Sequence, residues 1–230
     1  MLHDERLLAE DELGEVALAE KYVLLRARSL QRVVSFAPYG GGIRDTKLVV
    51  IHEVRNADLP LGFDPQALLN ERMGRVDARG VGMLTSRTVA SAELGSCAFG
   101  FRSARVLVTA GMSNAVRVGD EPGPLGEAFG TINIVAQLDG PLEDEALLEA
   151  LSIVAEARTC AVIEAGVRSR RSAGVATGTG TDCIAVLAPA LQEGRSRYAG
   201  KHTDTGHVLG AATYRGVTRA ITRWKTEQRK

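Results

Sequence analysis

The chain has 230 residues, and its 28 basic and 28 acidic side chains balance to a formal net charge of zero at pH 7. A general nucleic-acid-binding protein needs a basic surface, so this balance argues against nucleic acid as a partner. Hydrophobic residues make up 45% of the chain and aromatic residues only 4%. We therefore expect a substantial core built from Ala, Val, Leu and Ile, in one domain or two small ones.

The cysteines and the start of the chain indicate the cellular compartment. Cys97, Cys160 and Cys183 are scattered and form no CxxC pair. They indicate neither a disulfide framework nor a zinc site, and we interpret Cys183 as a small buried strand residue. Residues 1–20 are acidic, unlike a secretory signal, and no apolar run approaches the ~20 residues of a membrane span. We expect a cytoplasmic protein without a membrane partner.

The predicted elements follow one another along the whole chain. Residues 1–21 read as an acidic, polar or helical lead-in, and 22–230 as a single domain. Strands are predicted over 22–28, 32–36 (with a turn at Ser29–Leu30), 47–54, 80–84, 105–109, 129–137, 175–176 and 183–187. Helices are predicted over 66–73 after Pro65, 141–164 before Gly166, and 204–230 with Asp204 or Thr205 as cap. Loops are expected at 38–42, 56–65 and 112–126, while 88–93 fits either a helix or a strand.

This mixture predicts an α/β or α+β fold, with a mixed sheet, flanking helices and Gly-rich loops at strand ends. The basic C-terminal stretch and the acidic lead-in read as two solvated faces, or as partners of each other.

Four polar, glycine-bearing segments each adjoin a predicted strand. They are Ser35–Gly42, Thr109–Asp120, Gly174–Asp182 and Tyr198–Thr203. Because ligand sites of α/β proteins gather at strand ends, we expect these segments to converge on one cleft.

The third of these segments is the most informative. Thr177, Thr179 and Thr181 alternate with Gly178 and Gly180, and Asp182 follows. The hydroxyls and the carboxylate supply hydrogen-bonding groups, and glycine lets a ligand approach the backbone. The pattern favours binding of a ligand or a reacting carbonyl.

Two further groups of charged residues admit more than one interpretation. His202, Asp204 and His207 have the spacing HxDxxxH, which places two histidines poorly for a shared metal on a helix. His202, beside Lys201, suits an acid–base role better. Glu156 and Arg158 lie in the apolar 141–164 helix, either as a salt bridge at its edge or with the carboxylate facing the cleft. No phosphate-binding or nucleophile-elbow motif is present, and no motif requires a cofactor or a divalent metal.

Five ordered motifs together resemble the adenosylcobinamide amidohydrolase family. They are TAGMSNAVRVGD (109–120), GTINIVAQLDGPL (130–142), EARTCAV (156–162), ATGTGTDCIAV (176–186) and YAGKHTDTGHVLG (198–210). SFAPYGGG (35–42) and GVGMLTS (80–86) resemble the family's N-terminal half. The resemblance covers residues 22–222 and leaves residues 1–20 outside.

The resemblance implies a corrinoid-salvage amidohydrolase. Such enzymes cleave the amide that joins the aminopropanol arm to the corrin ring of adenosylcobinamide, and release adenosylcobyric acid and 1-amino-2-propanol for re-entry into cobamide synthesis. The partner is then a small corrinoid substrate, no cofactor is required, and homo-oligomerisation is left open.

An amide hydrolase needs a nucleophile or activated water, a proton donor and groups that bind the oxyanion. We hypothesise that Asp182 or Glu156 activates water and that His202 or Lys201 protonates the leaving amine. Thr177, Thr179 and Thr181 would position the carbonyl, or one would be the nucleophile. The remaining predicted substrate-binding residues are Gly41, Gly42, Ser113, Asn114, Asp120, Asn133, Gly178 and Gly180, of which Asp120 alternatively orders only its own loop.

Two alternatives stay open on the sequence. One is a non-catalytic corrinoid-binding protein on the same fold. The other is a hydrolase whose internal threonine is exposed as an N-terminal nucleophile by self-cleavage, which would yield two fragments of the 24.5 kDa chain.

Overall fold

The computed structural model describes residues 5–55, 64–123 and 130–229. The strands are β1 (Arg6–Asp11), β2 (Gly14–Ala19), β3 (Tyr22–Ser35), β4 (Gly42–Glu53), β5 (Val81–Thr85), β6 (Glu93–Phe99), β7 (Arg102–Ala110), β8 (Ala115–Val116), β9 (Ile132–Leu138), β10 (Gly178–Thr179) and β11 (Cys183–Pro189). The helices are α1 (Pro65–Val76), the short 3₁₀ helix η2 (Val89–Ser91), α2 (Asp144–Glu164) and α3 (Asp204–Glu227).

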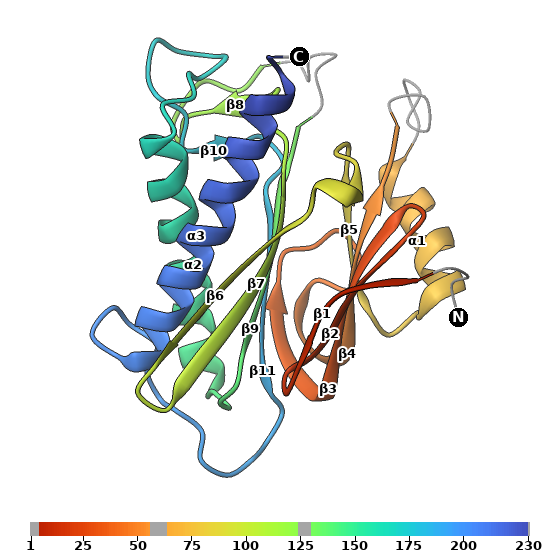
Figure 1. Ribbon diagram of the computed structural model, residues 1–230, viewed down its shortest axis with the longest axis vertical. Helices are drawn as coiled ribbons and strands as arrows, with labels where there is room; N and C mark the ends of the chain where they lie inside the picture. The colour runs from red at the N-terminus through yellow and green to blue at the C-terminus, as the bar shows by residue number, and fades with distance from the viewer. Residues whose placement is uncertain (1–4, 56–63, 124–129, 230) are drawn as a thin grey trace.

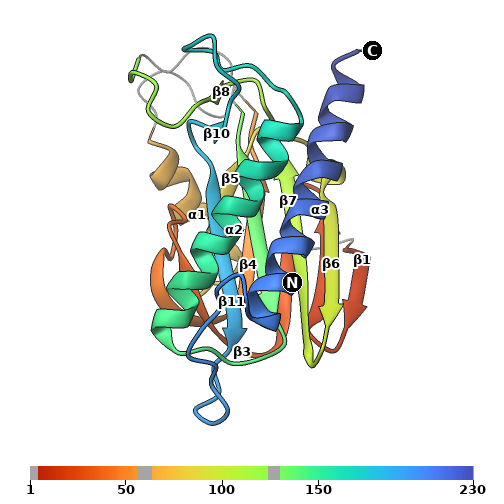
Figure 2. The ribbon, with the colours of Figure 1, turned by 90° about the vertical axis from the view of Figure 1, so that its left-hand side faces the viewer.

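The described residues form a nine-stranded mixed sheet that curls into two layers, which confirms the predicted fold class. Its main path runs β1-β2-β3-β11-β9-β7-β6, while β4 pairs with β3 and with β5. Figure 1 shows β6, β7, β9 and β11 in one layer and β1 to β5 in the other, with α2 and α3 outside the first layer and α1 outside the second. In Figure 2, α2 and α3 lie side by side across the first layer.

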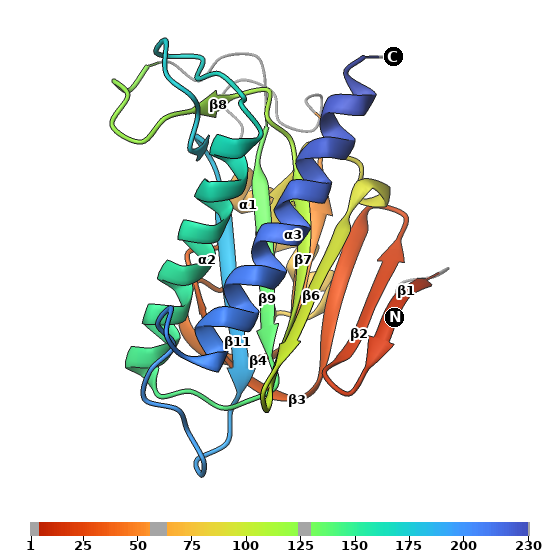
Figure 3. The ribbon, with the colours of Figure 1, turned by 60° about the vertical axis from the view of Figure 1, so that its left-hand side comes forward.

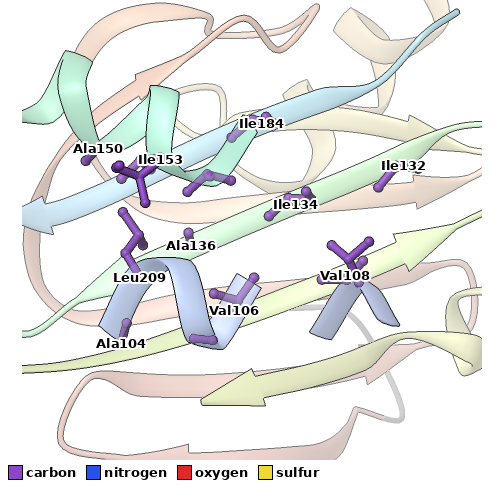
Figure 4. Packing of buried hydrophobic residues seen from close by; sticks show 14 of the residues in the cluster. Ala104, Val106, Val108, Ile132, Ile134, Ala136, Ala150, Ile153, Ile184 and Leu209 are labelled. Atoms are coloured by element: carbon purple, nitrogen blue, oxygen red, sulfur yellow. The ribbon is translucent and has the colours of Figure 1, made fainter. Parts of the chain in front are cut away.

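Among the described residues, three apolar clusters hold the strand layers and helices together. The largest lies between the first strand layer and helices α2 and α3; Figure 4 shows Ile134, Ile184 and Leu209 within it. A second cluster, with Leu107, Val135 and Ala185 among its members, joins the two strand layers. The third packs α1 against β3 and β4. Alternation along β9 sends Ile134 and Ala136 into the first cluster and Val135 into the second, as the two-residue period requires.

Strand directions bring several strand ends together at one end of the sheet. The neighbouring strands β9 and β11 are parallel, so both begin there. The antiparallel neighbours β7 and β3 end at the same place, because Ala110 pairs with Ile132 and Ser35 pairs with Ala185. We call this the strand-end site, and it is the upper end of the sheet in Figure 1, beside β8 and β10.

The N-terminal prediction was wrong. Residues 6–19 form the hairpin β1–β2 instead of a polar or helical lead-in, and β2 pairs with β3 along its full length. Val16 and Leu18 supply the reason, since their side chains are buried between the strand layers. The acidic residues of the hairpin pair with Arg26, Arg28 and Arg105, whereas no described basic residue of α3 pairs with them.

Several element boundaries also differ from the predictions. The turn expected at Ser29–Leu30 is absent, because β3 continues through it with only a shift in its pairing to β4. A strand was expected over 175–176, but Val175 forms only an isolated bridge. Thr203 caps α3 in place of Asp204 or Thr205, since its hydroxyl accepts from the backbone N–H of Gly206. Pro65 does start α1, behind the cap Asp64.

Some predicted ranges lie partly outside the described residues, namely the loop at 56–65, the end of the loop at 112–126, the start of the strand at 129–137 and Lys230. Segment 88–93 resolves into η2 and the first residue of β6.

Candidate active site at the ends of β9 and β11

Asp182 is the centre of the strand-end site. Its carboxylate forms a salt bridge with Arg158 of α2, and the two side chains are only 9% and 17% exposed. Oδ1 accepts from the Thr179 hydroxyl at 2.5 Å and from the backbone N–H of Ile132 at 3.2 Å. Burial raises the pKa of Asp182, and the Arg158 guanidinium and these hydrogen bonds oppose that rise. The carboxylate thereby links α2, β9 and the Thr177–Thr181 turn.

Glycine leaves room for this ion pair where the turn meets it. A Cβ on Gly178 would collide with both the Arg158 guanidinium and the Asp182 carboxylate. Gly130 has a similar role, because a Cβ there would lie 2.8 Å from Asn114 Oδ1 and from Ser113 N. These glycines let three segments of the chain approach one another closely.

Two threonine hydroxyls lie together at the beginnings of β9 and β11. Thr131 Oγ1 and Thr181 Oγ1 lie 2.7 Å apart, and Thr181 donates to the carbonyl of Gly130 at 3.0 Å. Thr177 accepts instead from the backbone N–H of Val118 at 2.8 Å. Thr131 belongs to a quoted motif, yet it was not among the predicted site residues. No pattern within its own segment distinguishes it, because its neighbour Thr181 is fifty residues away along the chain.

The hydrogen bonds of Asn133 and Asp120 give both residues structural roles. Asn133 is fully buried, and its amide donates to the carbonyl of Leu84 at 2.8 Å and to the Thr109 hydroxyl at 3.3 Å, so that it ties the two strand layers together. Asp120 accepts from the backbone N–H of Arg117 and from the Ser169 hydroxyl, and the Ser169 hydrogen bond lowers its pKa. Asp120 therefore orders its own loop.

Segment Ser35–Gly42 reaches the same end of the sheet. The Ser35 hydroxyl donates to the carbonyl of Ile184 at 2.7 Å. Gly41 and Gly42 are exposed, and Gly42 adopts a φ of +92°, which favours glycine. Three of the four predicted segments therefore meet at the strand-end site.

The fourth segment does not. Figure 3 shows the start of α3, directly after Tyr198–Thr203, at the opposite end of the sheet from β8. Lys201 forms a salt bridge with Glu156, and these side chains are 68% and 54% exposed. Glu156 and Arg158 lie about 200° apart around α2, so they face opposite sides of the helix. The structure thus separates Glu156, Lys201 and His202 from Asp182, and the expected convergence on a single cleft was wrong for this group.

Glu156, Lys201 and His202 line a separate surface pocket of about 420 Å³ beside α2, together with Glu149 and Tyr198. At the strand-end site itself, Cys183 is 5% exposed, and burial raises its pKa to about 12. The thiol therefore stays protonated at neutral pH, as suits the buried strand residue predicted.

Within the described ranges, no group of three or more His, Cys, Asp and Glu side chains is arranged to hold a metal ion. None of the helices in the described part of the chain has both the length and the apolar character that crossing a membrane requires.

The fold and the strand-end site define an α/β protein with polar side chains gathered at the ends of β9 and β11. The model of the adenosylcobinamide amidohydrolase family matches residues 4–229. The chain belongs to that family, whose members hydrolyse an amide C–N bond. The match includes the β1–β2 hairpin, and so corrects the expectation that residues 1–20 lie outside.

Other proteins are similar over shorter lengths or more loosely. The uncharacterised protein MJ1613 of Methanocaldococcus jannaschii is 36% identical over 96 residues, which are 41% of this chain and 37% of that protein's length. The β-aminopeptidase of a Burkholderia species has a TM-score of 0.46 at 14% identity, over 97% of this chain and 84% of that one. The L-aminopeptidase D-Ala-esterase/amidase of Ochrobactrum anthropi has a TM-score of 0.44 at 12% identity, over 95% and 82%.

Proposed function

We propose that this protein hydrolyses the aminopropanol amide of adenosylcobinamide, and that it releases adenosylcobyric acid and 1-amino-2-propanol for re-entry into cobamide synthesis. The family match over residues 4–229 carries the proposal. The corrinoid is then the substrate, and the reaction takes place in the cytoplasm without a cofactor.

The strand-end site supplies groups that such a reaction needs. The exposed backbones of Gly41, Gly42 and Gly180 allow a bulky ring to approach closely. Ser113 and Asn114 offer a hydroxyl and an amide to the carboxamide arms of the corrin. Asp182 has its oxygens engaged by Arg158 and Thr179, so we assign it to positioning rather than to the activation of water.

Glu156, Lys201 and His202 lie on the far side of α2, and the proposal leaves them out of the reaction. Their variants provide a contrast within the test. His202→Asn is expected to keep turnover, whereas Asp182→Asn is expected to lose it while still binding corrinoid.

The test is an assay of purified protein with adenosylcobinamide in dim light, followed by chromatography and mass spectrometry, with EDTA-treated enzyme in parallel. Adenosylcobyric acid among the products supports the proposal, and the EDTA sample decides metal dependence. A shifted corrinoid spectrum without product would favour a binding protein and contradict the hydrolase. Unchanged turnover of Asp182→Asn would contradict the role of Asp182.

A further inference from the structure

The paired hydroxyls of Thr131 and Thr181 have a definite hydrogen-bond direction. Thr181 Oγ1 lies 3.0 Å from the carbonyl oxygen of Gly130, which can only accept. The single hydroxyl proton of Thr181 therefore goes to Gly130, and Thr131 must donate its own proton to Thr181 across the 2.7 Å separation. The oxygen of Thr131 is left with its lone pairs uncommitted to any described residue.

The other threonines of the site are engaged differently. Thr179 is buried, and its hydroxyl donates to Asp182. The oxygen of Thr177 accepts the backbone N–H of Val118, so it holds the β8 loop in place. Thr181 donates to Gly130 and accepts from Thr131. Among these threonines, half-buried Thr131 is the one whose oxygen accepts no hydrogen bond from a described residue.

The peptide group that joins Thr131 to Ile132 is fixed at both its carbonyl and its N–H. Its carbonyl accepts from the backbone N–H of Gly111 at 3.0 Å, which attaches it to the end of β7. The next backbone N–H, that of Ile132, donates to Asp182 Oδ1 at 3.2 Å. A nucleophile needs such a fixed position, because a misplaced reacting atom loses much of the rate. The Arg158–Asp182 ion pair thus positions Thr131, because Asp182 holds the backbone N–H that follows it.

We propose that Thr131 is the nucleophile of this enzyme and that Thr181 relays its proton to the leaving amine. The proposal rests on the function proposed above. It extends that function by naming the attacking atom, which lies outside the Thr177–Asp182 turn.

The reaction then has two balanced steps. Thr131 Oγ1 bonds to the amide carbonyl carbon and the C–N bond breaks. The Thr131 proton passes to Thr181 while the Thr181 proton passes to the departing nitrogen, which leaves as 1-amino-2-propanol. Water then adds to the ester on Thr131; its OH remains on the acyl group as the carboxylic acid, and its other hydrogen returns to the Thr131 oxygen.

The test compares Thr131→Val, Thr131→Ser and the control Thr226→Ala, whose hydroxyl lies exposed on α3. Turnover is measured on adenosylcobinamide, and corrinoid binding by the spectral shift. Thr131→Val is expected to lose more than about 1,000-fold in kcat, as variants lacking a nucleophile do, with binding and thermal unfolding retained. Thr131→Ser should keep turnover within about 10-fold, because serine supplies the same hydroxyl, and Thr226→Ala should match the wild type.

Acid-quenched samples of the wild type and of Thr181→Val identify the covalent step. Intact-protein mass spectrometry should show an acyl adduct, and digestion should locate it on the peptide containing Thr131. Turnover of Thr131→Val within about 10-fold of the wild type would overturn the proposal. So would an adduct on another residue, or the absence of any adduct from both proteins. A wild type that fails to hydrolyse adenosylcobinamide would instead contradict the proposed function itself.

Discussion

Asp182 and Arg158 form a buried ion pair on which several segments depend. Both side chains are less than a fifth exposed, and the carboxylate also receives the Ile132 and Thr179 hydrogen bonds. Attraction within such a pair offsets the cost of removing two charges from water, and an unpaired buried charge loses that compensation. The loss of stability is therefore largest when only one partner of the pair is removed.

A double-mutant cycle measures this coupling. Asp182→Ala is expected to destabilise the protein by about 3–5 kcal/mol, because Arg158 is left buried and unpaired. The double variant Asp182→Ala/Arg158→Met should recover part of that loss, with a coupling energy of at least about 1 kcal/mol in urea unfolding. Additive losses would show that the two groups act independently.

His52 makes stability depend on pH. It is fully buried against Tyr22 and Met73, and burial lowers its pKa from 6.5 to about 3. Below pH 6.5 the unfolded chain takes up a proton at this site while the folded chain does not. The stabilisation of the fold by neutral His52 is therefore complete above pH 6.5, and it is lost as the pH falls toward 3.

Between pH 7 and pH 5, His52 should lower the free energy of unfolding by about 2 kcal/mol. His52→Leu is expected to remove this slope from urea unfolding curves measured across that interval. His207→Asn, at an exposed histidine of α3, should keep it. A slope that persists in His52→Leu would contradict the assignment.

The packing of α3 on the first strand layer depends on two facing glycines. A Cβ on Gly95 of β6 would overlap the carbonyl oxygen of Ala212 and lie 2.8 Å from the backbone nitrogen of Gly216. Both are backbone atoms, which cannot rotate away as a side chain can. The helix therefore approaches this strand more closely than any larger residue would permit.

Gly95→Ala is expected to cost about 1–3 kcal/mol or more, because α3 must move away from β6. The control is Gly74→Ala in α1, where an added Cβ meets open space. That variant should gain about 0.4–1 kcal/mol through the lower entropy of the unfolded chain. Thermal unfolding of the two variants, measured side by side, separates the contact from the general effect of replacing glycine. A Gly95→Ala protein as stable as the wild type would contradict the close approach.

The β1–β2 hairpin of the second strand layer covers a buried arginine of the first strand layer. Arg105 of β7 is 4% exposed, and its guanidinium donates to Asp11, to the carbonyl of Gly14 and to Gln137. Two of these three partners belong to the hairpin or its turn. The hairpin thus contributes both apolar cover and the hydrogen bonds that a buried guanidinium needs.

Deletion of residues 1–20 is expected to abolish the cooperative thermal transition. The deletion exposes to water both Arg105 and the second apolar cluster, which joins the two strand layers. The control Glu12→Ala changes only an exposed side chain of the turn and should unfold like the wild type. Circular dichroism on heating gives the comparison. A truncated chain that melts within about 4 °C of the full one would contradict the structural role of the hairpin.

The sequence by itself determined the elements whose signals are local. The Pro65 start of α1, the long apolar helix α2, the apolar strands β9 and β11 and the threonine-rich turn before Asp182 all follow from periodicity and turn chemistry within a few residues. The family motifs likewise lie within short segments, and they identified the class of enzyme. Local patterns misled where tertiary pairing decides, as in the acidic hairpin that is held by β3, and they also placed the cap of α3 one or two residues too late.

Only the tertiary structure decided which of the polar segments meet. Thr131 and Thr181 become neighbours because β9 and β11 are parallel and adjacent, a pairing that no local pattern encodes. Arg158 reaches Asp182, while Glu156 turns away to Lys201, because two residues span more than half a turn of α2. Apolar residues are spread around the whole circumference of α2, so they mark no single buried face. The sequence therefore left open which of these two charged residues faces the sheet. Strand order and helix rotation are long-range properties, and they separate the strand-end site from the residues beside the start of α3.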